Sequence, residues 1–124
     1  MTNKELKYGN ELITDFLEWD LAYIDEATNS KVINIPNYFY EDTGTTEWFM
    51  ESFLFDTSWE WTMFLWNELH RKVCIPMMRD NKHLRYLRTT IQETKKAIVW
   101  CHIEDAYKNM VKLIEIYNEQ FEQL

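Results

Sequence analysis

The chain has 124 residues and a net charge of −8, from 21 acidic residues against 13 lysines and arginines. This length predicts a single domain over residues 1–124, and 46% apolar residues are enough for a packed core. With only 2 glycines and 2 prolines, the composition excludes a glycine-rich phosphate loop and disfavours a β-barrel or sandwich.

The N-terminal part predicts one helix followed by a small sheet. Residues 4–18 have helical spacing, with Ile13 and Phe16 on the apolar face. Residues 19–56 lose this period and contain short β-favouring runs between turn-rich pieces. Two to four antiparallel strands are therefore expected, at residues 19–24, 31–35, 38–40 and 48–55. The last run equally fits a helix.

A second helix is predicted to begin near Thr57 and to end by Ile75. Thr57 and Glu60 have the spacing of a capping box, in which each side chain caps a backbone amide of the first turn. Pro76 disfavours helical geometry in the residue before it. Because apolar side chains, including Trp59 and Trp61, surround most of this helix, it is expected at the centre of the fold.

Two more helical patterns follow. Residues 80–98 keep a helical phase, although residues 97–101 also fit a short strand. From Ile103 to the C-terminus, apolar residues repeat at helical spacing over five turns. The predicted fold is therefore α+β and mostly helical, with a small antiparallel sheet packed on the central Trp-rich helix and on the long C-terminal helix.

The sequence contains no reliable catalytic signature. His70, Cys74, Cys101 and His102 are the only set that resembles zinc ligands, but the adjacent Cys101 and His102 fit one site poorly. Buried structural cysteines in a reducing compartment are the simpler interpretation. We expect no enzyme activity, no metal and no cofactor. The polar first 20 residues and the lack of a long apolar run predict a cytoplasmic protein that does not enter a membrane.

Charge is distributed unevenly along the chain. Residues 1–60 carry −10, residues 61–101 carry +5 and residues 102–124 carry −3. In the first segment, acids alternate with Trp and Tyr, which often anchor protein interfaces. This pattern predicts a surface for a basic partner. Its candidate residues are Trp19, Asp20, Tyr23, Asp25, Glu26, Tyr40, Glu41 and Asp42. The alternative is an ordinary half-buried sheet with its rings inside.

A second candidate site is a basic ridge. Arg79, Lys82, Arg85 and Arg88 recur every three residues, and Lys95 follows. Such a ridge can contact RNA phosphates, which makes RNA binding through residues 79–96 the alternative function. The simpler interpretation is that the acidic half of the fold neutralises it. A small-ligand-binding domain is a further alternative, and the oligomeric state is not predicted.

Three segments resemble a group of small uncharacterised proteins carried by phages and prophages. The first is residues 10–17. The second contains Ser58-Trp59-Glu60-Trp61, similar to the group's S-W-D-W-L-M motif, and the third begins at Ile103-Glu104-Asp105-Ala106-Tyr107 and continues through residues 114–120. Together they cover about a quarter of the chain. The sequence departs from the pattern at Thr62, where the group has an apolar residue, and at Ile116, where it has Trp.

The resemblance implies a biological setting rather than a mechanism, because the group has no established activity. Small acidic phage proteins often act against host defence, and anti-CRISPR proteins inhibit RNA-guided nucleases that have basic nucleic-acid channels. We therefore expect a non-enzymatic inhibitor of a host defence system, with a basic nucleic-acid-handling protein such as an RNA-guided nuclease as its partner.

Overall fold

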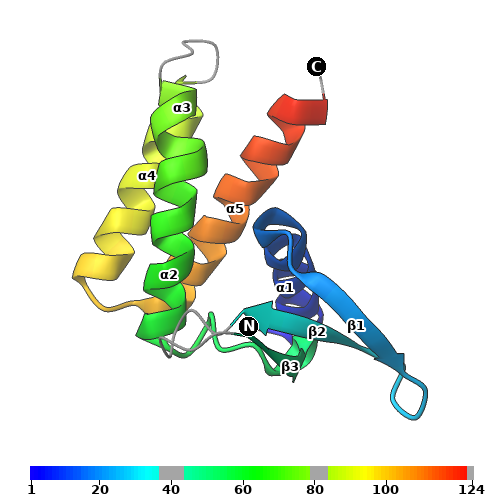
Figure 1. Cartoon of the computed structure of the whole chain (residues 1–124). Helices are drawn as coiled ribbons and strands as arrows, with labels where there is room; N and C mark the ends of the chain where they lie inside the picture. The colour runs from blue at the N-terminus through cyan, green and yellow to red at the C-terminus, as the bar shows by residue number, and fades with distance from the viewer. Residues whose placement is uncertain (37–43, 79–83, 123–124) are drawn as a thin grey trace. The chain divides into compact units, whose positions relative to one another are not determined.

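The computed structural model describes residues 1–36, 44–78 and 84–122, and the chain divides into two compact units, Met1–Phe53 and Leu54–Leu124. Unit 1 contains one α-helix, three strands and a short 3-10 helix among its described residues (Figure 1). In chain order these are α1 (Asn3–Leu17), β1 (Asp20–Asp25), β2 (Ser30–Pro36), β3 (Thr45–Phe49) and η2 (Met50–Ser52). The prediction of a helix over residues 4–18 is confirmed within one residue at each end.

Both ends of α1 have a clear physical cause. The Thr2 hydroxyl accepts a hydrogen bond from the Glu5 amide (3.1 Å), which caps the first turn. At the other end Glu18 has φ = 58°, and the amides of Glu18 and Trp19 donate back to the carbonyls of Asp15 and Thr14. This is a Schellman ending built without glycine. It turns the chain sharply from the helix into β1.

The described strands form an antiparallel sheet in the order β1-β2-β3. The first two predicted strands, at 19–24 and 31–35, are confirmed with ends shifted by one residue. The predicted run 48–55 is wrong as a strand, because β3 ends at Phe49 and the backbone enters η2. The predicted strand at 38–40 lies outside the described residues.

The large buried side chains of unit 1 come from α1, the turn between α1 and β1, β2, and the segment after β3. The largest ones at this core are Ile13, Phe16, Trp19, Val32, Ile33, Ile35, Met50 and Phe53. Two polar contacts fix the helix against the rest of the unit. The buried Asn10 side-chain amide donates to the Met50 carbonyl (3.0 Å), and Lys31 Nζ lies 2.8 Å from Glu11 Oε1.

Unit 2 is helical throughout its regular structure. A continuous rod is formed by α2 (Trp59–Leu69), the π-helix η3 (His70–Cys74) and α3 (Ile75–Met78), while α4 (Leu84–Val99) and α5 (Ile103–Glu122) form an antiparallel pair (Figure 1). The long C-terminal helix predicted from Ile103 is confirmed. Its buried residues include Ala106, Tyr107, Met110 and Ile114, the positions that the apolar period selects.

The start of α2 differs from the prediction. Ser58, rather than Thr57, is the N-cap residue, and its side chain makes no capping hydrogen bond. The buried Thr62 hydroxyl instead bonds to the carbonyls of Phe55 (2.7 Å) and Ser58 (2.9 Å). The predicted capping box is therefore wrong, because Ser58 takes the N-cap position and no side chain caps the helix there. The hydrogen bond from Thr62 to Phe55 connects the start of the helix to the preceding turn.

The helical rod continues through Pro76 to Met78, so the predicted end at Ile75 is also wrong. The π-helix explains the continuation. In η3 the Ile75 amide donates to the His70 carbonyl, five residues back. In a regular α-helix the ring of Pro76 would clash with the carbonyl of Lys72, four residues back. The wider π-turn leaves room for the ring at this carbonyl.

Residues 97–99 end α4, residues 100 and 101 form the turn after it, and none of them forms a strand. The helix runs to Val99, and the amides of Cys101 and His102 donate to the carbonyls of Ile98 (3.1 Å) and Ala97 (2.8 Å). Cys101 has φ = 58° and lies in the exposed turn before α5. The expectation that both cysteines are buried therefore holds for Cys74 and is wrong for Cys101.

The α+β, mostly helical fold class is confirmed. The sheet belongs to unit 1, and the Trp-rich helix and the long C-terminal helix belong to unit 2. The single domain and the packing of the sheet on these two helices concern the placement of one unit against the other, and they stay predictions. Among the described residues, every helix is too short or too polar to cross a lipid bilayer.

Candidate protein-binding site

Strand β1 brings together most of the described residues predicted to bind a partner. Asp20, Tyr23 and Asp25 lie on the strand, and Glu26 follows in the turn that leads to β2. Asp20, Tyr23 and Glu26 are exposed, and Asp25 is half-buried. Tyr40, Glu41 and Asp42 lie outside the described residues. The surface considered below, called the β1 surface, therefore comprises residues 20–26.

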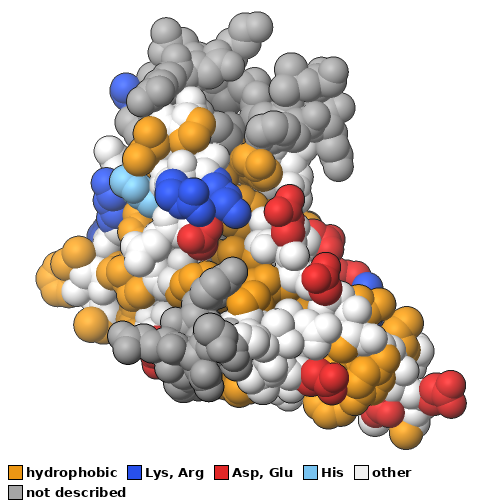
Figure 2. Space-filling model, viewed as in Figure 1, with side chains coloured by type: hydrophobic (Ala, Val, Ile, Leu, Met, Phe, Trp, Pro, Cys, Tyr) orange, Lys and Arg blue, Asp and Glu red, His pale blue; other side chains and the backbone are white. Residues whose placement is uncertain are grey.

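The structure adds two apolar residues that sequence reasoning missed. Leu21 and Ile24 are about half exposed, at 51% and 49%, like Tyr23 at 49%. Three large apolar side chains on one six-residue strand are thus about half exposed to solvent. The space-filling view shows apolar and acidic side chains gathered together at the outer end of the β1–β2 hairpin (Figure 2). The sequence Asp-Leu-Ala-Tyr-Ile-Asp, in which apolar residues lie between two aspartates, is the pattern that could have indicated these two residues.

A β-bulge sets the direction of these side chains. The pairing register shifts between Leu21 and Tyr23, so that Leu21 lies opposite Ile33 and Tyr23 opposite Val32. Ile24 lies opposite Lys31. Because directly opposed residues share a face of the sheet, Leu21 and Ile24 lie on the face of Lys31, and Tyr23 lies on the other face. The β1 surface therefore offers apolar contacts on both faces.

Trp19 does not belong to this surface. Its side chain is only 8% exposed, and its ring meets Phe53 edge to face with centroids 5.8 Å apart. The cause is the end of α1, where the Trp19 amide bonds back to Thr14 and directs the chain across the core of unit 1. Its proposed role as an exposed partner anchor is therefore corrected to a role in the core.

The acidic groups of the β1 surface have different local roles. The Asp25 carboxylate accepts a hydrogen bond from the Thr28 hydroxyl (2.8 Å), and its carbonyl accepts one from the Asn29 amide (2.7 Å). These bonds hold the turn before β2. Asp20 and Glu26 make no hydrogen bond or ion pair through their side chains within the described residues. Their carboxylates are therefore available to an external cation.

The net charge of the chain comes entirely from unit 1. Its sequence has 11 acids against 3 lysines, a net charge of −8, whereas unit 2 has 10 acids against 10 lysines and arginines. One of the three lysines, Lys31, is paired with Glu11, and this hydrogen bond raises the pKa of Lys31. The β1 surface thus belongs to a unit whose electrostatic potential favours cations.

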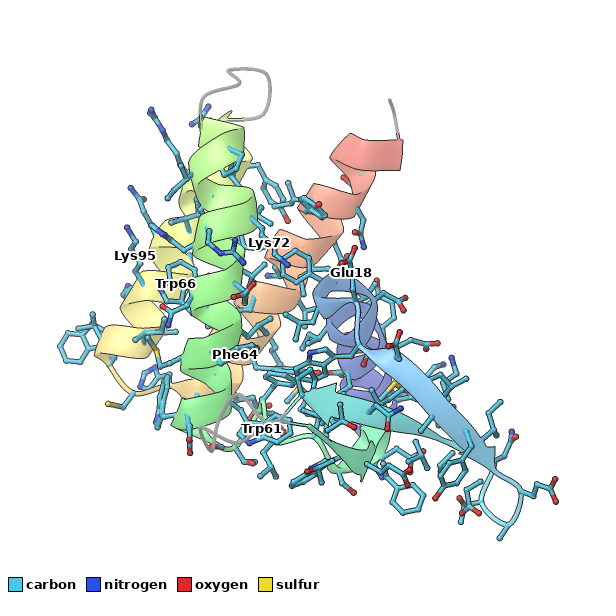
Figure 3. All side chains as sticks on the ribbon, viewed as in Figure 1. Glu18, Trp61, Phe64, Trp66, Lys72 and Lys95 are labelled. Carbon is cyan, nitrogen blue, oxygen red and sulfur yellow. The ribbon has the colours of Figure 1, made fainter. Side chains whose placement is uncertain are left out.

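The basic ridge is only partly described, because Arg79 and Lys82 lie outside the described residues. Arg85 and Arg88 are exposed on α4, followed by Lys95 and Lys96. Within the part of unit 2 that the structure describes, none of these four cations has a carboxylate within ion-pair distance. Figure 3 shows Lys95 extending outward from α4. Neutralisation of the ridge by the acidic N-terminal half of the chain concerns the other unit, and it stays a prediction.

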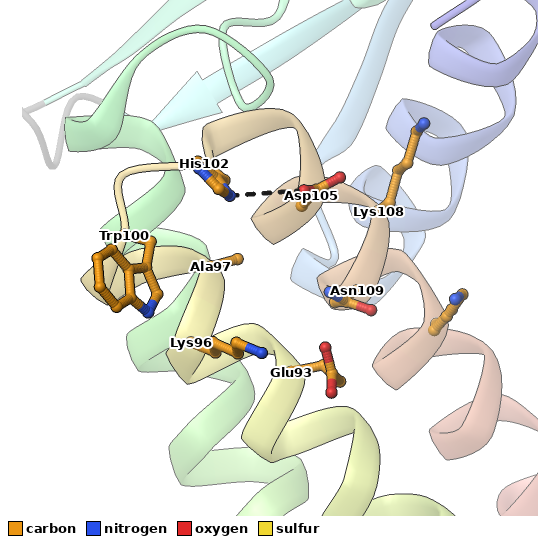
Figure 4. Close-up of a pocket in the computed structure, with 9 residues that line it drawn as sticks. Glu93, Lys96, Ala97, Trp100, His102, Asp105, Lys108 and Asn109 are labelled. Carbon is orange, nitrogen blue, oxygen red and sulfur yellow. Dashed lines mark ion pairs between the residues drawn. The ribbon is translucent and has the colours of Figure 1, made fainter.

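A hollow of about 530 Å³ lies along the α4–α5 pair (Figure 4). Its walls carry cations such as Lys96 and Lys112, the carboxylates of Glu93 and Asp105, and the 66% exposed ring of Trp100. His102 Nδ1 lies 3.8 Å from Asp105 Oδ2, which is the dashed contact in Figure 4. Since both signs of charge line it, the hollow selects no ligand class as clearly as the β1 surface does.

The described residues considered as metal ligands do not form a group of three or more that could hold an ion. Burial raises the pKa of the Cys74 thiol to about 11, although Lys95 acts in the opposite direction. A protonated thiol is a poor zinc ligand. Cys101 is exposed in the turn after α4. Within residues 1–36, 44–78 and 84–122, no three His, Cys, Asp or Glu side chains are grouped to hold a metal ion.

Comparison with known proteins returned no match to this chain from protein-family models, curated proteins or solved structures.

Proposed function

We propose that this chain is a non-enzymatic binding protein that uses the β1 surface to engage a basic partner protein. The observation that carries the proposal is the coincidence, on one exposed strand, of three half-exposed apolar side chains with carboxylates at both ends. Apolar groups give an interface its affinity, and charges give it a fast, selective encounter. Neither β1 nor its turn presents a lysine or arginine.

The partner class follows from charge and from the phage-protein resemblance. A unit of net charge −8 repels nucleic acid and attracts proteins that bind nucleic acid. The basic channel of an RNA-guided nuclease is such a surface, and inhibition of that nuclease, as part of an anti-defence role in a phage, is the function we propose. Carboxylates on β1 would occupy positions that nucleic-acid phosphates otherwise take.

The test compares two charge reversals of equal size. One variant carries Asp20→Lys, Asp25→Lys and Glu26→Lys on the β1 surface, and the control carries Glu93→Lys, Asp105→Lys and Glu119→Lys in unit 2. Both change the net charge by the same amount. DNA cleavage by a purified RNA-guided nuclease is measured with each protein added.

We expect the natural chain and the unit 2 control to inhibit cleavage, and the β1 variant to lose inhibition while its circular dichroism spectrum shows that it stays folded. Equal inhibition by the two variants would contradict a role for the β1 surface. Cleavage that is unaffected by the natural chain in low salt would contradict the nuclease as partner.

RNA binding by α4 is the second candidate function, favoured by the lack of ion pairs at Arg85 and Arg88 among the described residues. Tyr86, 59% exposed between them in sequence, offers a ring for base stacking. If RNA binds here, Arg85→Gln with Arg88→Gln should reduce the slope of log affinity against log salt concentration by the amount that about two phosphate contacts contribute. Salt-independent binding, or none in low salt, would remove this candidate.

A further inference from the structure

The β1 strand has one edge that no described strand covers. The sheet order is β1-β2-β3, so β1 pairs only with β2 and forms an edge of the sheet. The outer edge of such a strand presents backbone N–H and C=O groups that can pair with another extended chain. Six residues give an edge about 20 Å long, which is enough for a short strand.

The side chains of β1 leave this edge open to a partner strand. Leu21 and Ile24 on one face and Tyr23 on the other are each about half exposed, so an added strand can pack against apolar groups on both faces. Ala22, at the bulge, adds little bulk between them. Natural proteins commonly protect an exposed edge by covering it, by shortening it, by a β-bulge, or by placing charged residues or proline on it. Of these devices β1 has the bulge and an aspartate at each end, and residues 21–24 between the aspartates contain no charge and no proline.

Charge selects the occupant of the edge. In an antiparallel pair formed by two copies of β1, Asp20 of one copy would approach Asp25 of the other, and like charges directly opposite each other destabilise a sheet. A segment with lysine or arginine at both ends and apolar or β-branched residues between them would place opposite charges against both aspartates. This complementarity disfavours a second copy and favours a cationic segment of another protein.

The other edge of the sheet is a weaker candidate. Strand β3 carries a single charged residue, Glu47. Its two large apolar residues are Phe49, which is 43% exposed, and Trp48, which is half-buried. Its sequence offers one carboxylate near the middle, whereas β1 has one at each end. The β3 edge therefore lacks the paired charges that would fix the register of an added cationic strand.

We propose that β1 binds its partner by strand addition, in which an extended cationic segment pairs its backbone with the free edge of β1 and aligns its end charges with Asp20 and Asp25. This inference rests on the proposed function and specifies its binding mode. The main-chain hydrogen bonds supply part of the affinity, and the aspartates together with Leu21, Tyr23 and Ile24 supply selectivity.

The test uses the full chain, labelled with ¹⁵N, and the synthetic peptide acetyl-Lys-Val-Thr-Val-Lys-amide. Its two lysines share one face of a strand, as Asp20 and Asp25 do because the bulge places them opposite Asn34 and Ser30. Two further peptides carry backbone N-methyl groups on alternate residues, one on the odd set and one on the even set. Because alternate amides of a strand point to opposite edges, only one of these two sets can face β1. A fourth peptide has glutamate in place of both lysines.

We expect the unmodified peptide to shift the amide resonances of residues 20–26 and to give nuclear Overhauser contacts between its backbone and that of β1. One N-methylated peptide should bind at least about tenfold more weakly, since several main-chain hydrogen bonds are lost, and the other should bind like the parent. The glutamate peptide should not bind.

Equal binding by both N-methylated peptides would overturn strand addition, as would resonance shifts confined to other parts of the chain. The two proposals fail separately. If charge reversal on β1 abolishes inhibition of the nuclease while both methylated peptides bind equally, the function stands and the pairing mode is wrong. If the methylation pattern is as expected but cleavage is never inhibited, strand addition stands and the nuclease is the wrong partner.

Discussion

The pair Trp19 and Tyr23 provides a direct test of which aromatic residue supports the fold and which meets the partner. Trp19 is 8% exposed and packs edge to face on Phe53, whereas Tyr23 is 49% exposed. Truncation of a buried Trp typically costs about 3–5 kcal/mol, because contacts are lost and a cavity remains. Truncation of a half-exposed Tyr on an edge strand should cost about 0.5 kcal/mol.

Hydrogen exchange on β2 measures this difference within unit 1. Since about 1.4 kcal/mol corresponds to a tenfold change, Trp19→Ala should accelerate exchange of the amides of residues 30–35 at least about a hundredfold. Tyr23→Ala should change it about twofold. Comparable acceleration in the two variants would refute the assignment of Trp19 to the core and of Tyr23 to the surface.

Partner binding gives the complementary result. Trp19→Phe keeps an aromatic ring in the core of unit 1 and is expected to leave inhibition of the nuclease unchanged. Tyr23→Ala is expected to weaken it, because it removes the apolar group on one face of β1. If a folded Trp19→Phe protein lost inhibition as Tyr23→Ala does, Trp19 would contact the partner and the correction made above would be wrong.

Two further predictions concern unit 2. Thr62→Val keeps the side-chain volume but removes the buried donor to Phe55, and should lower the free energy of unfolding by about 1–2 kcal/mol in urea titrations. The equally buried Thr94 bonds only within its own helix, to the Thr90 carbonyl, so Thr94→Val should change it by less than about 0.5 kcal/mol; equal losses would contradict this distinction. The raised pKa of Cys74, from 9.0 to about 11, means that the unfolded chain loses this proton first as the pH rises. Stability should therefore fall by about 1 kcal/mol between pH 8 and pH 10, and Cys74→Val should reduce the fall, whereas an unchanged slope would exclude the thiol as its source.

The helices were predictable because their apolar residues repeat with the helical period, on one face in α1, α4 and α5 and around most of α2. In α5 the period of Ala106, Tyr107, Met110 and Ile114 is strong enough to fix both the element and its buried side. The first two strands were predictable from β-favouring residues between turn signals. Backbone geometry that depends on tertiary contacts was not predictable in this way. The π-turn before Pro76 and the Thr62 bond to Phe55 have no local pattern that distinguishes them from the usual proline stop and capping box.

The candidate site was predictable in position but not in detail. Clustered acids and aromatic residues indicated the segment that contains β1, and Asp20, Tyr23 and Glu26 are exposed there. The alternation of residues could not show that Trp19 turns inward, because that depends on the helix ending at Glu18. It also could not show that a bulge places Leu21 and Ile24 on one face, because the register of the sheet decides this.

The aspartates of β1 have a simpler explanation that one experiment separates from partner recognition. Charges beside an exposed apolar strand prevent self-association of edges, whatever their sign, whereas recognition of a cationic segment requires negative charge. Asp20→Asn with Asp25→Asn removes both effects, and Asp20→Lys with Asp25→Lys keeps the protection but reverses the recognition. We therefore expect the asparagine variant to self-associate in analytical ultracentrifugation, and the lysine variant to remain as dispersed as the natural chain while it no longer binds the cationic peptide. If the lysine variant bound that peptide as strongly as the natural chain does, the aspartates would protect the edge without selecting what pairs with it.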